Sequence, residues 1–232
     1  MKTAVLAPLE TTWEAWVLGG GAAASFERAD LPLDVEIGPG EDDFLLRQAL
    51  AHPEHNWLGI EYSRKRVHRY VRKVLHEAGP LGNLRLIWRP AADLVRPFLA
   101  PARVQGYTVL FPDPWPKKHH HRYRLLDRPF LEDVGESLVE GGTLRLLTDH
   151  LDYAEAIAEA AAGVESLEPA LPAPGFETVC EGTLPTVFEA RWRAQGKEIH
   201  HLVLRRKGVR RGQTRPNPIG PSDPAHEKDP AS

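Results

Sequence analysis

Short β-prone segments alternate with helical segments along most of this 232-residue chain. The β-prone segments are apolar and bounded by glycine, proline or other turn residues, whereas apolar residues between them recur at helical spacing. The strands are predicted at 34–38, 57–61, 83–88, 106–111, 142–148 and 198–204, and the helices at 44–50, 63–79, 130–139 and 151–162. This alternation predicts an α/β fold with a Rossmann-like, mostly parallel central sheet and helices on both faces.

The composition of the chain changes near residue 208. Residues 208–232 are rich in proline and polar residues and offer too few apolar side chains to bury a core, so we expect a disordered Pro/Arg-rich tail. Residues 1–207 have the length of a single α/β domain. We therefore predict one domain, 1–207, followed by the tail.

The composition also excludes several classes of protein. The single cysteine, Cys180, cannot form an intramolecular disulfide, and no Cys-x-x-Cys motif or His/Cys cluster accompanies it, so we expect no metal site. No apolar run approaches the roughly 20 residues that span a bilayer, and the apolar stretch within Met1 to Pro8 is too short for a signal peptide. We expect a cytoplasmic protein without membrane contact, and the sequence leaves the oligomeric state open.

The formal net charge is −3, from 29 Lys and Arg against 32 Asp and Glu. This balance argues against a protein that is basic all over, but it allows a local basic patch. Basic residues gather in three clusters: Arg64, Lys65, Arg66, Arg69, Arg72 and Lys73; Lys117, Lys118, Arg122, Arg124 and Arg128; and Arg205, Arg206, Lys207, Arg210 and Arg211. Only the middle cluster looks unlike the solvated face of a helix.

A glycine turn follows the first predicted strand, in Glu36-Ile37-Gly38-Pro39-Gly40. Such a turn lets backbone N–H groups approach a ligand at the start of the next helix. Glu61 ends the second strand, 21 residues after Gly40, where an acidic side chain binds ribose hydroxyls in nucleoside-binding α/β folds. Together the two motifs predict a nucleoside cofactor, and on their own they do not distinguish NAD from S-adenosylmethionine.

A proline-rich loop, Phe111 to Arg122, follows the fourth strand and therefore belongs to the edge of the sheet where ligands bind. Its prolines restrict the backbone around Asp113 and Trp115, and the basic residues after them could bind a phosphate backbone. The consecutive histidines 119–121 point in different directions and lack a partner of metal-ligand spacing, so we expect solvation or RNA contact for them.

Two further segments carry polar residues at positions of interest. Thr148 and Asp149 end the fifth strand, and residues 186–189 lie in a region predicted to be irregular before the last strand. Taken alone, each segment fits a helix cap or an ion pair as well as a binding site.

In their order and spacing, the motifs Glu-Ile-Gly-x-Gly, Gly-Ile-Glu, Phe-Pro-Asp-Pro-Trp-Pro-Lys-Lys, Thr-Asp and Thr-x-Phe-Glu resemble those of the bacterial tRNA (guanine-N7-)-methyltransferases. The resemblance runs from about Trp13 to about Leu204. It implies a class I methyltransferase fold, S-adenosylmethionine as the methyl donor, and tRNA as the substrate, modified at guanosine 46 in the variable loop.

The resemblance also implies roles for individual residues. Asp113 is the expected central residue of the active site. The expected cofactor contacts are Glu36, Gly38, Gly40, Glu61 and Asp113. The expected substrate contacts are Lys117, Asp149, Thr186, Val187, Phe188 and Glu189.

Two positions depart from the family pattern. Asp42 stands where the family usually has a third glycine, and Pro90 where it has an acidic residue near the adenine, for which Asp93 is a candidate substitute. Two alternatives therefore stay open: a methyltransferase acting on an exocyclic amine of a nucleic acid, and a tRNA-binding protein with weakened catalysis. The first usually has two prolines and an aromatic residue after its Asn or Asp, whereas here Trp115 follows a single proline.

Overall fold

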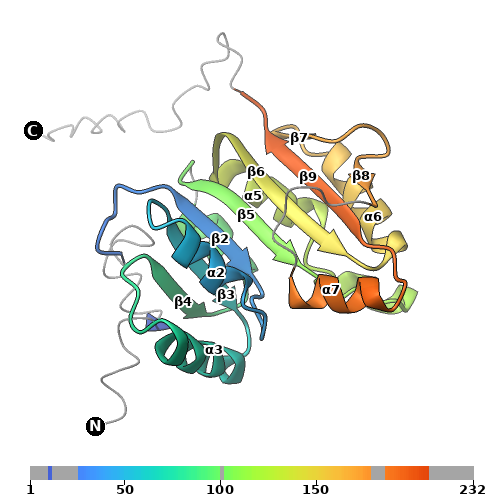
Figure 1. The fold of residues 1–232 in the computed structure, drawn as a ribbon. Coiled ribbons are helices and arrows are strands. Elements are labelled where there is room, and N and C mark those ends of the chain that lie inside the picture. Colours follow the sequence, from blue (N-terminus) through green and yellow to red (C-terminus); the bar gives the residue numbers. More distant parts are fainter. Residues whose placement is uncertain (1–9, 12–25, 100–101, 179–185, 209–232) are drawn as a thin grey trace, which may run out of the picture.

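A central sheet organises the computed structural model, which describes residues 10–11, 26–99, 102–178 and 186–208 (Figure 1). Within these residues the strand order is β1-β4-β3-β2-β5-β6-β9-β7, and β8 pairs with β9. The strands are β1 Glu10–Thr11, β2 Leu33–Ile37, β3 Asn56–Glu61, β4 Leu84–Trp88, β5 Val104–Leu110, β6 Leu138–Thr148, β7 Leu167–Pro169, β8 Phe176–Glu177 and β9 His200–Arg206. Along this order, every neighbouring pair from β1 to β6 is parallel (β1–β4, β4–β3, β3–β2, β2–β5 and β5–β6), and β9 is antiparallel to β6, β7 and β8.

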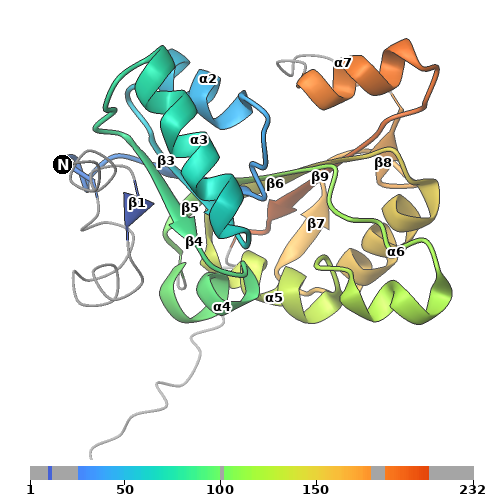
Figure 2. The same cartoon turned by 90° about the horizontal axis from the view of Figure 1, so that it is seen from below.

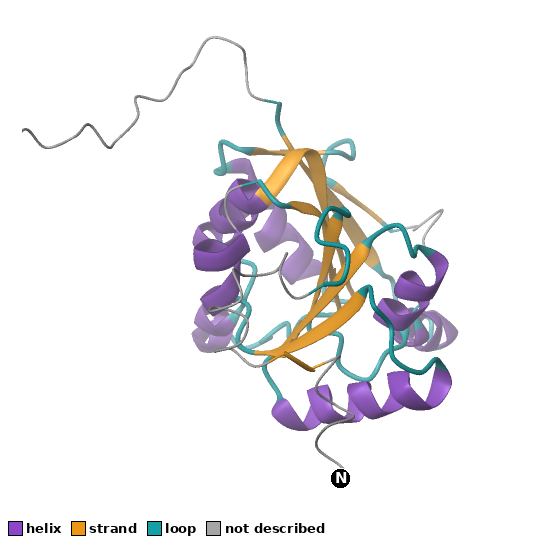
Figure 3. Ribbon diagram, turned by 90° about the vertical axis from the view of Figure 1, so that its left-hand side faces the viewer, coloured by secondary structure: helices purple, strands orange, loops and turns teal. Residues whose placement is uncertain are grey.

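Helices cover both faces of this sheet, as Figures 2 and 3 show. Figure 2 places α2, α3 and α7 on one side and α4, α5 and α6 on the other. The helices are α2 Phe44–Ala51, α3 Arg64–Glu77, α4 Ala92–Leu94, α5 Arg128–Ser137, α6 Leu151–Ala162 and α7 Val187–Ala194, with a π-helix η2 at Val95–Leu99 and a 3-10 helix η3 at Lys118–Tyr123. The predicted α/β fold with a mostly parallel sheet is therefore confirmed.

Burial explains why these segments fold as they do. Every residue of β3 is buried, as expected of a strand covered on both faces. The apolar stripe of α3, formed by Val67, Tyr70, Val71 and Val74, packs with residues of α2, β3 and β4 in one cluster. A second, larger cluster joins β2, β5 and β6 to α5 and α6.

The topology also locates a ligand crevice. From β2 the chain builds outward through β3 to β4, and it then returns to place β5 on the other side of β2. The carboxyl ends of β2 and β5 therefore flank the point where the strand order reverses, and ligands of open α/β sheets bind at this point.

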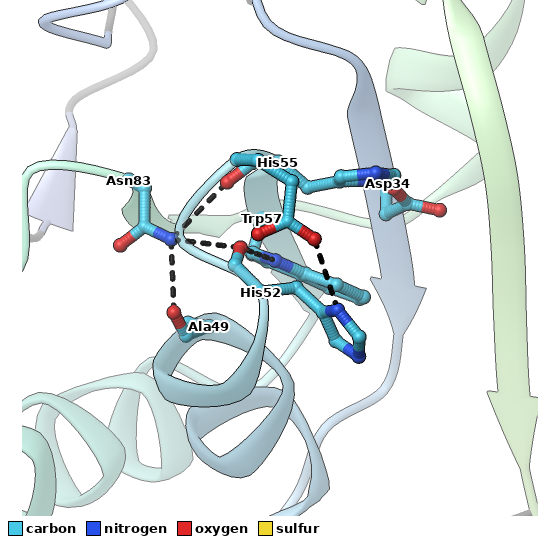
Figure 4. Close-up of polar contacts among 7 residues, drawn as sticks. Asp34, Ala49, His52, His55, Trp57 and Asn83 are labelled. Carbon is cyan, nitrogen blue, oxygen red and sulfur yellow. Dashed lines mark hydrogen bonds and ion pairs between the residues drawn. The ribbon is translucent and has the colours of Figure 1, made fainter.

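Polar side chains at the opposite edge hold the sheet together (Figure 4). The side-chain amide of Asn83 donates to the carbonyl oxygens of Ala49 and His55, at 3.0 and 3.1 Å. The Nδ1 atom of His55 lies 2.6 Å from Oδ2 of Asp34, whose pKa is raised because the carboxyl is buried. These contacts connect the end of α2 and the strand β2 with the residues just before β3 and β4.

The predicted secondary structure is wrong at two places. The helix predicted at 130–139 ends at Ser137, because Leu138 adopts an extended backbone and begins β6. Residues 186–189 were expected to be irregular, but Thr186 caps α7 and residues 187–189 form its first turn. The predicted tail beyond Gly208 and the single cysteine, Cys180, lie outside the described residues.

Candidate active site

A pocket of about 440 Å³ opens at the carboxyl ends of β2 and β5. It is lined by Glu36, Gly38, Pro39, Gly40, Glu41, Asp42, Arg66, Leu110, Phe111, Pro112, Asp113, Pro114, Asp149, His150 and Trp192. Five of these side chains are carboxylates, against one arginine and one histidine. The pocket is therefore suited to a ligand that carries positive charge.

The glycine turn after β2 forms one wall of the pocket. Gly38 and Gly40 have φ values of +72° and +59°, a left-handed conformation that glycine adopts without steric cost. Glu61 lies beneath this turn and is not part of the lining. Its Oε2 accepts from the N–H of Gly40 at 3.2 Å, and its Oε1 accepts from the N–H of Ser63 at 2.8 Å. In these contacts Glu61 therefore holds the glycine turn against the start of α3.

Glu36 places a buried carboxyl in the pocket. Glu36 is 2% exposed, and its Oε2 has no hydrogen-bond partner among the described residues. Burial, followed by the nearby charge of Asp42, raises the pKa of Glu36 well above its ordinary value. Asp42 is itself buried, and its Oδ1 accepts from the N–H of Phe44 at the start of α2. Asp42, where the family pattern has glycine, thus lines the pocket and acts electrostatically on Glu36.

The proline-rich loop after β5 carries Asp113 into the pocket. Phe111 and Trp115, on either side of Asp113, have φ values of +49° and +45°, which are strained for residues with side chains. Arg124 stabilises this loop: its Nε donates to the carbonyl oxygen of Pro114 at 2.8 Å, and its Nη2 lies 2.5 Å from Oδ2 of Asp152. Arg124 is only 8% exposed. It is therefore an anchor of the loop, although the sequence grouped it with Lys117 and Lys118 in one basic cluster.

The end of the loop and the 3-10 helix η3 that follows it present aromatic and basic side chains. The ring of Trp115 lies 5.6 Å from that of His120 and 5.3 Å from that of Tyr123. Lys117 and Lys118 are exposed where η3 begins. No group of three or more potential His, Cys, Asp or Glu ligands that could hold a metal is found in the part of the chain that the structure describes.

Helix α7 lies close to the ends of β5 and β6 (Figure 1). The Oγ1 of Thr186 accepts from the N–H of Glu189 at 2.9 Å and caps the helix. Trp192 of this helix lines the pocket. The Nζ of Lys197 lies 3.7 Å from the centre of the Trp192 ring and 2.6 Å from Oδ2 of Asp149. Lys197 thus joins the end of α7 to the end of β6.

The structure brings together only some of the residues expected from the sequence. Glu36, Gly38, Gly40, Asp113 and Asp149 line one pocket. Glu61, Lys117, Thr186 and Glu189 lie outside its lining, and so do Pro90 and Asp93, which are both exposed. Val187 and Phe188 are the first two residues of α7.

Sequence reasoning missed Glu41, Arg66, His150 and Trp192, all of which line the pocket. The signal for Trp192 was Thr186, six residues earlier: this residue type favours an N-cap and so marks the start of a helix that includes Trp192.

No helix among the described residues is both long enough and apolar enough to cross a membrane.

Comparisons with known proteins agree with this geometry. The family described as "Putative methyltransferase" matches residues 30–202. A protein of Treponema pallidum (strain Nichols) named tRNA (guanine-N(7)-)-methyltransferase is 38% identical over 180 residues, which cover 76% of this chain and 68% of the relative. A protein of the same name from Alkalilimnicola ehrlichii is 34% identical over 206 residues, which cover 86% of this chain and 85% of the relative.

Solved structures show the same fold at low sequence identity. The antibiotic-resistance methyltransferase Kmr superposes with a TM-score of 0.55 at 18% identity, over 77% of this chain and 88% of that one. The 16S rRNA methyltransferase KamB gives a TM-score of 0.52 at 16% identity, over 76% of this chain and 88% of that one. The fold is therefore that of the class I methyltransferases.

Proposed function

We propose that this protein transfers a methyl group from S-adenosylmethionine to N7 of guanosine 46 in the variable loop of tRNA, because the chain belongs to the family of tRNA (guanine-N(7)-)-methyltransferases. The observation that carries the proposal is a pocket rich in carboxylates at the switch point of the sheet, with Asp113 in its lining. A tRNA substrate also implies a cytoplasmic location.

The residues of the pocket fit S-adenosylmethionine. When bound, this cofactor supplies an electrophilic methyl group on a positively charged sulfur. The unpartnered buried oxygen of Glu36 can accept a hydrogen bond from a cationic ligand, which would also favour ionisation of Glu36. The left-handed Gly38 and Gly40 leave the backbone open to close approach. Glu61, at the end of β3 but outside the pocket lining, is our candidate for the ribose hydroxyls through the second lone pair of each oxygen that accepts from the backbone.

The transfer itself requires positioning rather than proton abstraction. N7 of guanine has a lone pair in the plane of the ring and carries no proton, so its attack on a methyl group needs no general base. The pocket must align N7 with the methyl carbon and exclude water, which can lower the barrier by several kcal/mol as an order of magnitude. The anchored loop that holds Asp113 and α7 with Trp192 are the two walls that provide this alignment.

Asp113 has two roles in this account. Positive charge develops on the purine as the methyl group transfers, and a fixed carboxylate stabilises it. The same carboxylate can accept hydrogen bonds from N1–H and the 2-amino group of guanine, and adenine has neither of these donors. Asp113 therefore serves both catalysis and selection of guanine, while Lys117 and Lys118 contact the phosphate backbone.

The two alternatives make different demands on the site. An exocyclic amine has to lose a proton during methylation, whereas N7 does not. A tRNA-binding protein without catalysis would have no need of a donor, so binding of S-adenosylmethionine measured by calorimetry separates it from both enzymes.

The test uses an unmodified tRNA transcript, S-adenosylmethionine and the purified protein. N7-methylguanosine makes the RNA chain cleavable by borohydride and aniline, so the incubated tRNA should break at one site in the variable loop. A reaction without the donor should show no cleavage. If donor binding is intact and the tRNA remains whole, the target atom or the substrate is wrong.

A further inference from the structure

A dense group of cations lies on the outer surface of α3. We define the α3 basic face as Arg64, Lys65, Arg66, Arg69, Arg72 and Lys73. These six residues fall within ten positions, and the only acidic residue of the helix is Glu77 at its end. All but Lys73 are exposed, because the opposite side of the helix is the apolar stripe that packs on the sheet. In a chain with a net charge of −3, so many cations on one surface require an explanation.

Few of these cations are neutralised within the protein. Arg69 pairs with Glu41, and Nη1 of Arg66 lies 4.0 Å from Oε1 of Glu61. The other four members form no ion pair with any residue that the structure describes. Ion pairing inside the fold therefore does not account for the α3 basic face.

The face also works against the helix that carries it. Its first three members occupy the first turn of α3, which contains no acidic residue. Positive charges at this end oppose the helix dipole, whose N-terminal end is itself positive. The side chain of Ser63, at the N-cap position, makes no capping hydrogen bond. A sequence chosen only for stability would place acidic residues in this turn.

The α3 basic face begins at the rim of the pocket. Arg66 is part of the pocket lining. The guanidinium groups of Arg66 and Arg64 lie over the rings of Tyr62 and Trp88, at 5.8 and 5.3 Å. These rings are 59% and 45% exposed, so aromatic and cationic surface occur together. From Arg66 to Lys73 the helix rises about 10 Å, which carries the cations away from the pocket.

We propose that the α3 basic face binds the phosphate backbone of the tRNA next to the nucleotide held in the pocket. The proposal rests on the proposed function, because it takes tRNA as the substrate. A polyanion supplies the negative charge that the fold does not, and it also offsets the repulsion at the start of the helix. The exposed Tyr62 and Trp88 add surfaces on which unpaired bases can stack.

Two variants test this surface. The triple variant K65A/R72A/K73A removes three cations that lie outside the pocket lining. We expect it to weaken binding of an unmodified tRNA transcript at least about tenfold at low salt, and to reduce the salt dependence of log K by about one for each phosphate that is no longer neutralised. The single variant Lys65→Glu should lower tRNA affinity while raising the melting temperature, because it places an acid in the first turn of α3.

The matched control is R28A/R96A/R103A, which removes the same charge from the segment before β2, from η2 and from the residue just before β5. It should bind tRNA as the wild type does, and all variants should retain their affinity for S-adenosylmethionine. The proposal is overturned if the α3 variant keeps the wild-type affinity and salt dependence, or if the control variant is weakened as much. A wild-type protein that binds tRNA but never methylates it would instead overturn the proposed function and leave this comparison valid.

Discussion

At the scale of single residues, Glu36 is an ionisable carboxyl in a buried environment. Its pKa is raised by burial and by Asp42, so the folded protein favours the protonated carboxyl. A raised carboxyl pKa gives stability that is present below the unfolded pKa, near 4.5, and lost as pH rises through the folded pKa. At neutral pH Glu36 therefore destabilises the free protein, and a cationic ligand recovers part of that free energy.

The substitution Glu36→Gln tests this account. The amide has the same shape and does not ionise, so the variant should melt at a higher temperature than the wild type at about pH 7–8, and the difference should shrink toward pH 4. A gain in stability shifts the melting temperature by roughly 2–4 °C per kcal/mol for a chain of this size. Affinity for S-adenosylmethionine, measured by calorimetry, should fall. A variant that is less stable at every pH would show that the carboxyl makes a favourable contact in the free protein.

Asp113 and Lys117 are expected to act on different quantities. Asp113→Asn keeps the shape of the side chain but removes its charge, so turnover should fall at least about a hundredfold, far more than donor affinity falls. Lys117→Ala should weaken tRNA binding and reduce its salt dependence by about one, because one phosphate is no longer neutralised. Single-turnover rates and filter binding separate the two effects. If both variants change only tRNA affinity, and equally, Asp113 has no part in the chemistry.

At the scale of elements, the sequence predicts the strands and helices that have a clear period. The strands β2, β3 and β4 lie within one or two residues of their predicted positions, because each is short, apolar and bounded by turn residues. The start of β6 was missed since Gly141 and Gly142 resemble a turn, yet Leu138 pairs with Val104 of β5. Helix α7 was missed although Thr186 is a residue type that favours an N-cap, and its place beside the pocket comes from tertiary structure, which no local pattern encodes.

The N-cap of α7 gives a prediction at this scale. Thr186→Ala removes the oxygen that accepts from the N–H of Glu189, which costs about 1 kcal/mol of local helix stability. Because α7 carries Trp192 into the pocket, KM for tRNA should rise several-fold. Thr186→Ser keeps the hydroxyl and should behave as the wild type. Hydrogen exchange of the α7 amides should increase in the alanine variant alone, and unchanged exchange would exclude a capping role.

At the scale of the whole molecule, the mostly parallel sheet covered by helices follows from the alternation of strands and helices, whereas the strand order and the composition of the pocket do not. The positions of Gly38 and Asp113 at the carboxyl edge of the sheet could be predicted from the sequence because each follows a strand. The anchoring role of Arg124 was not predicted from the basic cluster it belongs to, since its bond to the carbonyl oxygen of Pro114 depends on how the loop folds back. The charge of the pocket likewise emerges only when the walls of the fold are assembled.

The boundary between the domain and the tail is a prediction about the whole molecule. We propose that residues 1–207 fold without the tail, because the composition of 208–232 offers little apolar area to bury. Deletion of residues 209–232 should leave the melting temperature nearly unchanged. Any decrease in tRNA affinity should appear at low salt and fade as salt rises, because exposed charges are screened beyond about 8 Å at physiological ionic strength. A large fall in thermal stability would place the boundary elsewhere.

The central claim is that the methyl group goes to N7 of guanine, and replacing that atom tests it most directly. Two transcripts of one tRNA are compared, one with guanosine and one with 7-deazaguanosine, in which a C–H group replaces N7 but the 2-amino group remains. Each is incubated with labelled S-adenosylmethionine and the wild-type protein, after equal binding of both transcripts has been established. The account predicts incorporation of label into the first transcript, released as 7-methylguanosine on digestion, and none into the second. Equal labelling of both transcripts would contradict it and assign the reaction to an exocyclic amine or another atom.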